Sequence, residues 1–211
     1  MDPSPTIPRV TAEPLIVTLL RHGEIEWPRN AFLGSSDPPL TALGREQMER
    51  AVAALGGPPL TAVATSPLTR CRTFATGFAA ARGLALDVVP GLAEMGFGEW
   101  EGLTHAEVAE RYPRQLAAFR ADPTSERAPG GEHFEEFAAR VHAAFDQWTR
   151  DRRGHALVIA HSGVLRALLI GWLGVPPPNM ARFAMPFAAT CRVSLPAGEP
   201  PCVLAVNFAA A

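Results

Sequence analysis

Two short apolar runs constrain the fold of this chain more than any other feature of its sequence. They are LIVTLL at residues 15–20 and ALVIA at residues 156–160. Continuous apolar runs of this length are typical of strands buried on both faces, as in a parallel sheet covered by helices. A histidine lies directly beyond each run, His161 immediately after the second and His22 one residue after the first. Open α/β sheets bind ligands at the carboxyl ends of such strands, so both histidines are candidate site residues.

The segments between these runs alternate between helical and extended patterns. Shorter strands are predicted at 61–65 and 85–89, and extended runs at 187–195 and 202–208 flank a turn rich in proline and glycine. This order predicts an α/β fold: a three-layer α/β/α sandwich with a mainly parallel sheet and an antiparallel C-terminal hairpin.

Apolar residues at helical spacing predict the helices. One helix should follow Thr41, and another should begin at Ser66, which would cap it with Pro67 in the first turn. The clearest amphipathic pattern covers residues 134–148, and a short helical excursion is expected at about 104–125.

The first fourteen residues contain four prolines and no periodicity. We expect residues 1–14 to be a flexible tail and residues 15–211 to form a single domain.

Composition narrows the classes of function. The formal net charge is -2, whereas a nucleic-acid-binding protein normally carries a basic excess. No run approaches the roughly 18 apolar residues of a membrane span, and no apolar signal segment opens the chain. We therefore expect a cytoplasmic protein without nucleic-acid or membrane partners.

The cysteines, Cys71, Cys191 and Cys202, are odd in number and scattered, which favours free thiols over a disulfide framework.

Further polar residues are expected at the same edge of the sheet as the two histidines. Arg21 precedes His22, Arg70 lies in a helix after a strand, and Glu94 lies in a glycine-rich loop after another strand. A lone histidine at a strand end is more often structural, but this combination suits a phosphate ester. Guanidinium groups match phosphate oxygens, imidazole can attack phosphorus, and glutamate can protonate the departing oxygen. Ser162 lacks the G-x-S-x-G context of a serine hydrolase.

Six sequence blocks together resemble the histidine phosphatase superfamily, also called the phosphoglycerate mutase-like family. The resemblance runs in the family's order over nearly the whole expected domain. The blocks are LLRHGE (19–24), GSSDPPLTALG (34–44), SPLTRC (66–71), EMGFGEWEG (94–102), PGGE (129–132) and HSGVLR (161–166).

The resemblance implies a role for each of five residues. His22 would be the nucleophile that forms a phosphohistidine, Glu94 the proton donor and His161 the second catalytic histidine. Arg21 and Arg70 would bind the phosphate. The same resemblance implies a phosphoglycerate mutase-like fold. Because two arginines and an imidazole can hold the phosphoryl charge, we expect no metal and no cofactor.

The chain also departs from the family pattern. Where many members have a hydroxyl residue after RHGE and an asparagine three positions later, this sequence has Ile25 and Pro28. Asn30 follows two residues further on and is a candidate replacement for that phosphate-binding asparagine. Away from the site blocks, His155 is expected at the surface.

The compact FGEWEG continuation favours a phosphatase over a phosphoglycerate mutase-type enzyme. The blocks look most like those of α-ribazole-5′-phosphate phosphatases, so a small-molecule phosphate ester is the expected partner. A broad-specificity phosphatase and a mutase-type enzyme remain alternatives, as does an inactive phosphoryl-binding module on the same fold. The sequence does not indicate an oligomeric state.

Overall fold

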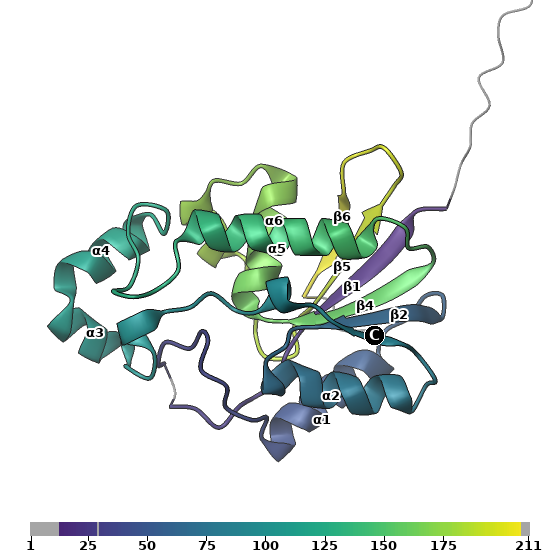
Figure 1. The fold of residues 1–211 in the computed structure, drawn as a ribbon, viewed down its shortest axis with the longest axis horizontal. Coiled ribbons are helices and arrows are strands. Elements are labelled where there is room, and N and C mark those ends of the chain that lie inside the picture. The colour runs from purple at the N-terminus through teal and green to yellow at the C-terminus, as the bar shows by residue number, and fades with distance from the viewer. Residues whose placement is uncertain (1–12, 29, 208–211) are drawn as a thin grey trace, which may run out of the picture.

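The computed structural model describes residues 13–28 and 30–207, so nearly all of the expected tail lies outside it. The described residues form one six-stranded sheet in the order β3-β2-β4-β1-β5-β6 (Figure 1). β3, β2, β4 and β1 pair in parallel, and β5 and β6 continue the sheet in antiparallel pairing. The mainly parallel sheet with a C-terminal hairpin is thus confirmed. The strands are Leu15–Arg21 (β1), Leu60–Thr65 (β2), Leu86–Val88 (β3), His155–Ala160 (β4), Thr190–Leu195 (β5) and Cys202–Val206 (β6).

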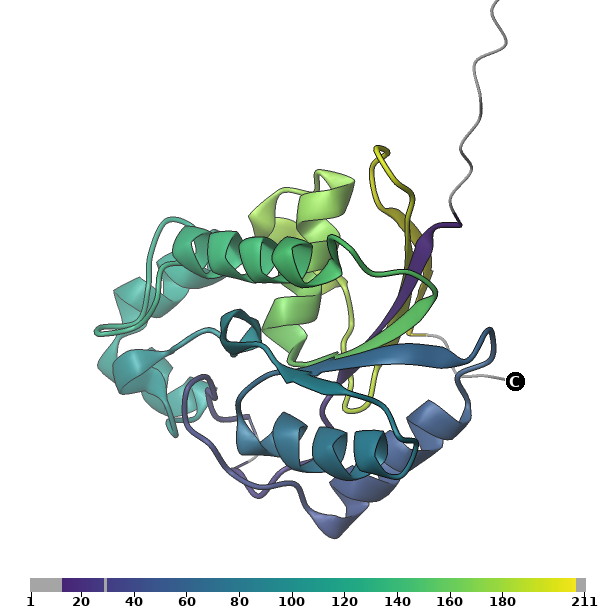
Figure 2. The same cartoon turned by 45° about the vertical axis from the view of Figure 1, so that its right-hand side comes forward.

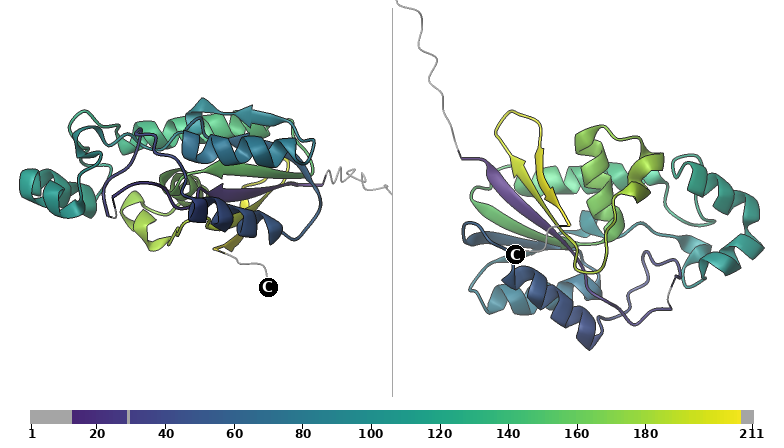
Figure 3. Two further views of the ribbon diagram at one scale, coloured as in Figure 1. Left: turned by 90° about the horizontal axis from the view of Figure 1, so that it is seen from below. Right: turned by 180° about the vertical axis from the view of Figure 1, so that it is seen from behind.

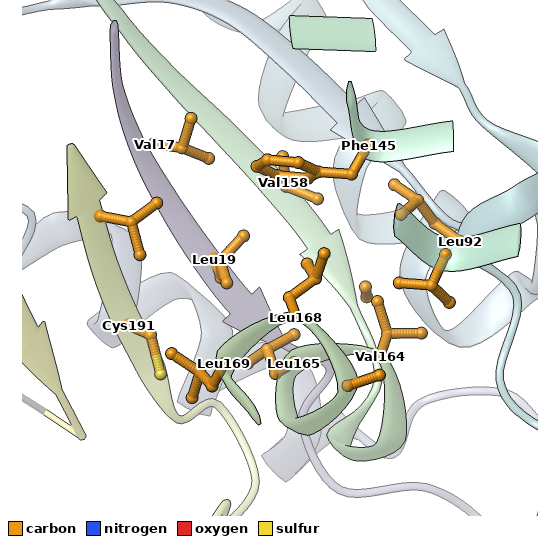
Figure 4. Close-up of a cluster of buried hydrophobic side chains, with 14 of the residues drawn as sticks. Val17, Leu19, Leu92, Phe145, Val158, Val164, Leu165, Leu168, Leu169 and Cys191 are labelled. Atoms are coloured by element: carbon orange, nitrogen blue, oxygen red, sulfur yellow. The ribbon is translucent and has the colours of Figure 1, made fainter. Parts of the chain in front are cut away.

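Helices cover both faces of this sheet and make the expected three layers (Figures 1 and 2). α5 and α6 lie on one face, and α1 and α2 lie on the other. Val17, Leu19 and Val158 point toward α5 and α6, where they pack against side chains such as Phe145 and Leu168 (Figure 4). The bounds are Ala42–Ala53 (α1), Thr69–Ala80 (α2), Phe134–Thr149 (α5) and Ser162–Leu173 (α6).

The opposite face carries the alternate residues of the same strands. Leu20 and Ile159 pack there against Met48 of α1 and Phe74 of α2. Because successive strand residues point to opposite faces, an unbroken apolar run is what a sheet covered on both sides requires. Burying each such side chain stabilises the fold by about 1.5–3 kcal/mol.

The segment between β3 and α5 leaves the sheet. α3 (His105–Arg111) and α4 (Pro113–Ala121) lie at one end of the molecule, beyond the carboxyl ends of the parallel strands (Figures 1 and 3). Trp100 is fully buried beneath them with Phe32, so its indole belongs to the core of this region. Three 3₁₀ helices complete the description: Pro90–Leu92 (η1), Gly98–Trp100 (η2) and Pro177–Arg182 (η3).

Two local expectations were wrong. α2 begins at Thr69 rather than after a Ser66 cap, and its first turn is capped by Asp37, whose carboxylate accepts hydrogen bonds from the Thr69 backbone N–H (2.6 Å) and hydroxyl (2.7 Å). A cap from a distant loop leaves no local sequence signal. His155 is buried rather than at the surface, because it occupies the first position of the central strand β4. In the described part of the chain, no helix is long and apolar enough to cross a membrane.

Candidate active site

The two strand-end histidines lie side by side. β1 and β4 are hydrogen-bonded neighbours with Arg21 opposite Ala160, so the residues that follow leave the sheet at the same point. His22 and His161 are both buried, and their ring centroids are 5.3 Å apart in an edge-to-face arrangement. The register of the two central strands therefore places both imidazoles at one location.

His22 is held as a neutral imidazole with one defined tautomer. Its Nδ1 lies 2.8 Å from the carbonyl oxygen of Gly23, and because a carbonyl can only accept, Nδ1 carries the proton. Burial, and then the charges of Arg21 and Arg70, lower the pKa of His22 well below its usual value of 6.5. At neutral pH, Nε2 consequently has a free lone pair.

Arg21 lies beside this imidazole, and part of its hydrogen-bonding capacity is unused. Burial lowers its pKa to about 10, so the guanidinium remains a cation at neutral pH. It donates to the carbonyl of Met185 and lies over the ring of Phe187, 4.4 Å from the ring centroid. Within the described part of the chain, its buried Nε has no hydrogen-bond partner. An uncommitted buried donor of this kind suits an anionic ligand.

Arg70 is completely buried and fixed by a loop. Its terminal nitrogens donate to the carbonyls of Ser36 (2.6 Å) and Gly34 (2.8 Å), and its Nε donates to Nδ1 of His161 (3.2 Å). One N–H on each terminal nitrogen is left for a ligand. The loop is held in turn by Glu101, whose carboxylate accepts the backbone N–H and hydroxyl hydrogen bonds of two consecutive serines, Ser35 and Ser36.

Ser66 is a site residue that the sequence did not reveal. His161 accepts from Arg70 at Nδ1, and burial, followed by the Arg70 charge, lowers its pKa well below 6.5. The neutral ring therefore carries its proton on Nε2, which donates to the hydroxyl of Ser66 at 2.6 Å. The same hydroxyl also accepts the backbone N–H of Leu68 at 3.3 Å, in the turn that precedes α2. The place of Ser66 in the SPLTRC block with Arg70 was the available signal.

Glu94 is buried at the N-terminus of α6. Its Oε2 accepts the backbone N–H of Gly163 (3.0 Å), and its Oε1 accepts that of Met95 (3.2 Å). A Cβ on Gly163 would lie only 2.2 Å from Oε1, so glycine is required for this approach. Burial lowers the pKa of Arg21 and Arg70, and the nearby Glu94 charge partly opposes that lowering. A helix N-terminal N–H can favour a bound anion, and here the N–H of Gly163 serves the protein's own carboxylate.

Asn30 makes no hydrogen bond with these groups within the described part of the chain. Its backbone adopts the left-handed conformation (φ 62°), the residue is exposed, and its carbonyl accepts the backbone N–H of His105 at 3.1 Å. Its side chain makes no hydrogen bond within the described residues, so its proposed contact with phosphate stays a prediction. The neighbouring Ile25 is buried and pairs with Leu40.

Taken together, the site combines a neutral imidazole with a free lone pair, two guanidinium groups, a second imidazole and a carboxyl group. This set can hold a phosphoryl group and exchange its substituents. Comparison with known proteins assigns the fold to a family, because the model of the histidine phosphatase superfamily (branch 1) matches residues 17–207. The chain belongs to this superfamily.

Curated relatives of the chain include named phosphatases. The adenosylcobalamin/alpha-ribazole phosphatase of Escherichia coli is 30% identical over 167 residues, which cover 78% of this chain and 82% of that protein. A Mycobacterium tuberculosis protein described as bifunctional is 39% identical over 176 residues, covering 79% of this chain. The chain spans about half the length of that relative (47%).

Solved structures agree with the family assignment. The native structure of a mycobacterial glucosyl-3-phosphoglycerate phosphatase superimposes with a TM-score of 0.80 at 26% identity, covering 92% of this chain and 99% of that one. The same mycobacterial protein has been solved with VO3 and with inorganic phosphate. The relatives thus include enzymes named as phosphatases and one named as a phosphoglycerate mutase.

Proposed function

We propose that this histidine phosphatase hydrolyses a small phosphomonoester through a phosphohistidine on His22. The observation that carries the proposal is the His22 tautomer, which presents the unprotonated Nε2 beside Arg21 and Arg70. A neutral imidazole is the reactive form, and it is buried between cations that attract the phosphoryl group.

The first step forms an N–P bond and breaks the ester P–O bond. Nε2 of His22 attacks phosphorus, and protonated Glu94 transfers its proton to the leaving alkoxide. The ring gains positive charge as the bond forms, and the Gly23 carbonyl, which accepts from Nδ1, stabilises that charge. Arg21 and Arg70 hold the equatorial oxygens, and His161, whose Nδ1 accepts from Arg70, keeps that guanidinium in place.

The second step returns the enzyme to its starting state. The Glu94 carboxylate removes a proton from water, the water oxygen attacks phosphorus, and the N–P bond breaks. Inorganic phosphate leaves, Glu94 is protonated again, and His22 is again neutral. The arginines supply the positive charge that a metal would otherwise provide, so the reaction should proceed without one.

We propose α-ribazole 5′-phosphate as the substrate. The name of the Escherichia coli relative supports this choice. Phe187 supports it as well: the residue is 38% exposed, and its ring centroid lies 5.9 Å from that of His22. An exposed aromatic surface beside the nucleophile suits a substrate with an aromatic base. The likeness to the mycobacterial enzyme makes glucosyl-3-phosphoglycerate a second candidate.

A substrate panel and a trapping experiment test the proposal. With a chelator present, the purified chain should release phosphate from α-ribazole 5′-phosphate with a higher kcat/KM than from glucosyl-3-phosphoglycerate or 3-phosphoglycerate. Acid-labile, base-stable label should appear on His22 after quenching, and the His22→Ala variant should lose both label and turnover. Retention of more than about 1% activity, a loss below about 2.7 kcal/mol, would contradict a nucleophilic role.

A further inference from the structure

Arg140 uses its whole guanidinium to hold the segment that carries Glu94. From α5 it donates to the backbone carbonyls of Gly91 (3.0 Å), Ala93 (2.8 Å) and Glu94 (3.1 Å). Its remaining two N–H groups form a bidentate pair with the Glu132 carboxylate at 2.6 and 2.8 Å. All five N–H donors of an arginine are therefore engaged.

The segment also lies unusually close to α5. A Cβ on Gly91 would be 2.4 Å from the Cβ of Ala144 and 3.1 Å from the carbonyl oxygen of Arg140, so only glycine permits this packing. On the other side of Glu94, the backbone N–H of Glu132 donates to the carbonyl of Gly96 at 2.9 Å. The backbone on both sides of Glu94 is thus held by the Arg140–Glu132 ion pair and by packing against α5.

We infer that Arg140 and Glu132 are positioning residues for Glu94, and this inference rests on the proton-donor role proposed above. Neither residue is among those that contact the phosphoryl group in the mechanism. Their effect passes through the backbone, which determines whether the Glu94 carboxyl reaches both Gly163 and the leaving oxygen. A displacement of about 1 Å at a reacting group can cost about 10²-fold in rate. Lysine cannot replace this arginine, because an ammonium cannot span three carbonyls and a carboxylate.

Leaving-group dependence separates a positioning role from a general structural one. A phenolate departs without much help, whereas an alkoxide needs a proton. The Arg140→Gln and Arg140→Lys variants should therefore lose about 10²-fold in single-turnover phosphorylation of His22 by an alkyl phosphate. With an aryl phosphate they should lose no more than a few-fold. Arg152→Gln is the matched control, because Arg152 lies just beyond the same helix and is paired with Asp87 away from the site. It should match the wild type on both substrates.

A double-mutant cycle makes the test specific to Glu94. In a Glu94→Gln background, Arg140→Gln should lower the phosphorylation rate by less than about a further three-fold. The glutamine at position 94 has no acidic proton to donate, so its exact position no longer matters. Equal losses on both substrates, or full additivity in the cycle, would overturn the inference. If Glu94→Gln itself showed no leaving-group dependence, the proton-donor proposal would fail instead.

A gentler variant covers the case in which Arg140→Gln does not fold. Glu132→Gln keeps the side-chain shape and leaves the three carbonyls that Arg140 binds in place, but it removes the carboxylate charge and replaces one of its two acceptor oxygens with an N–H donor. It should show the same selective loss with the alkyl phosphate, about five- to ten-fold, and an unchanged circular dichroism spectrum. Wild-type rates on both substrates would show that Arg140 and Glu132 do not position Glu94.

Discussion

A single added methyl group should separate Glu94 from its place at the α6 N-terminus. In the Gly163→Ala variant, the new Cβ would lie 2.2 Å from Oε1 of Glu94, where ordinary contact begins at 3.4 Å. The carboxyl must therefore retreat by about 1 Å, and its hydrogen bond from the Gly163 N–H must lengthen. A shift of that size at a reacting group corresponds to about a 10²-fold loss of rate, or about 2.7 kcal/mol.

The fold itself should tolerate this change. Gly163 lies in the first turn of α6, and alanine in a helix is favoured over glycine by roughly 0.5–1 kcal/mol. Gly77→Ala in α2 is the control, since its Cβ would meet nothing within 4 Å. That variant should be slightly more stable than the wild type and fully active.

The assay is steady-state hydrolysis of an alkyl and an aryl phosphate, with thermal unfolding measured on the same samples. Gly163→Ala should lose alkyl phosphate hydrolysis by about 10²-fold at an unchanged or higher Tm. Wild-type rates with both substrates would show that the position of Glu94 does not matter for catalysis. A lowered Tm with parallel loss on both substrates would instead mean that the methyl group disturbs the helix.

Four further outcomes are expected. Glu101→Gln should loosen the loop that holds Arg70, raise KM for phosphate esters several-fold and destabilise the fold by about 1–3 kcal/mol in urea unfolding. Because burial lowers the pKa of His22 well below 6.5, its imidazole should stay neutral as pH falls through 6.5; an NMR titration of the His22 ring centred at 6.5 would contradict this. Burial likewise lowers the pKa of His155, so at mildly acidic pH this imidazole is protonated in the unfolded chain before it is protonated in the folded protein. The free energy of unfolding should therefore fall as pH drops below about 6.5, and it should fall less in His155→Gln. Finally, activity measured as phosphate release should survive prolonged chelation and should not rise on adding Mg²⁺.

The layered arrangement could be predicted from the sequence because it depends on local patterns. The unbroken apolar runs of β1 and β4 fit strands covered on both faces, and helical periodicity between them fits the covering layers. The strand ends then placed His22 and His161 at one edge, since parallel neighbours end together.

The supports of the site depended on contacts between distant segments. Ser66 contacts His161 across 95 positions, Asp37 caps α2 across 32, and Arg140 reaches the Glu94 segment across about 46. Hydrogen bonds of this kind leave no periodicity or spacing in the sequence, because only the packing of the layers brings the partners together.

The sequence by itself thus determined which groups meet at the candidate site: the two strand-end histidines, two arginines and one carboxyl group. Only the tertiary structure decided their chemical state. Burial and neighbouring cations keep His22 neutral, the Gly23 carbonyl selects its tautomer, and Glu94 lies where the missing Cβ of Gly163 leaves room. The physical reason is that tautomer, charge and close approach depend on three-dimensional surroundings, whereas residue type and strand register follow from the order of the chain.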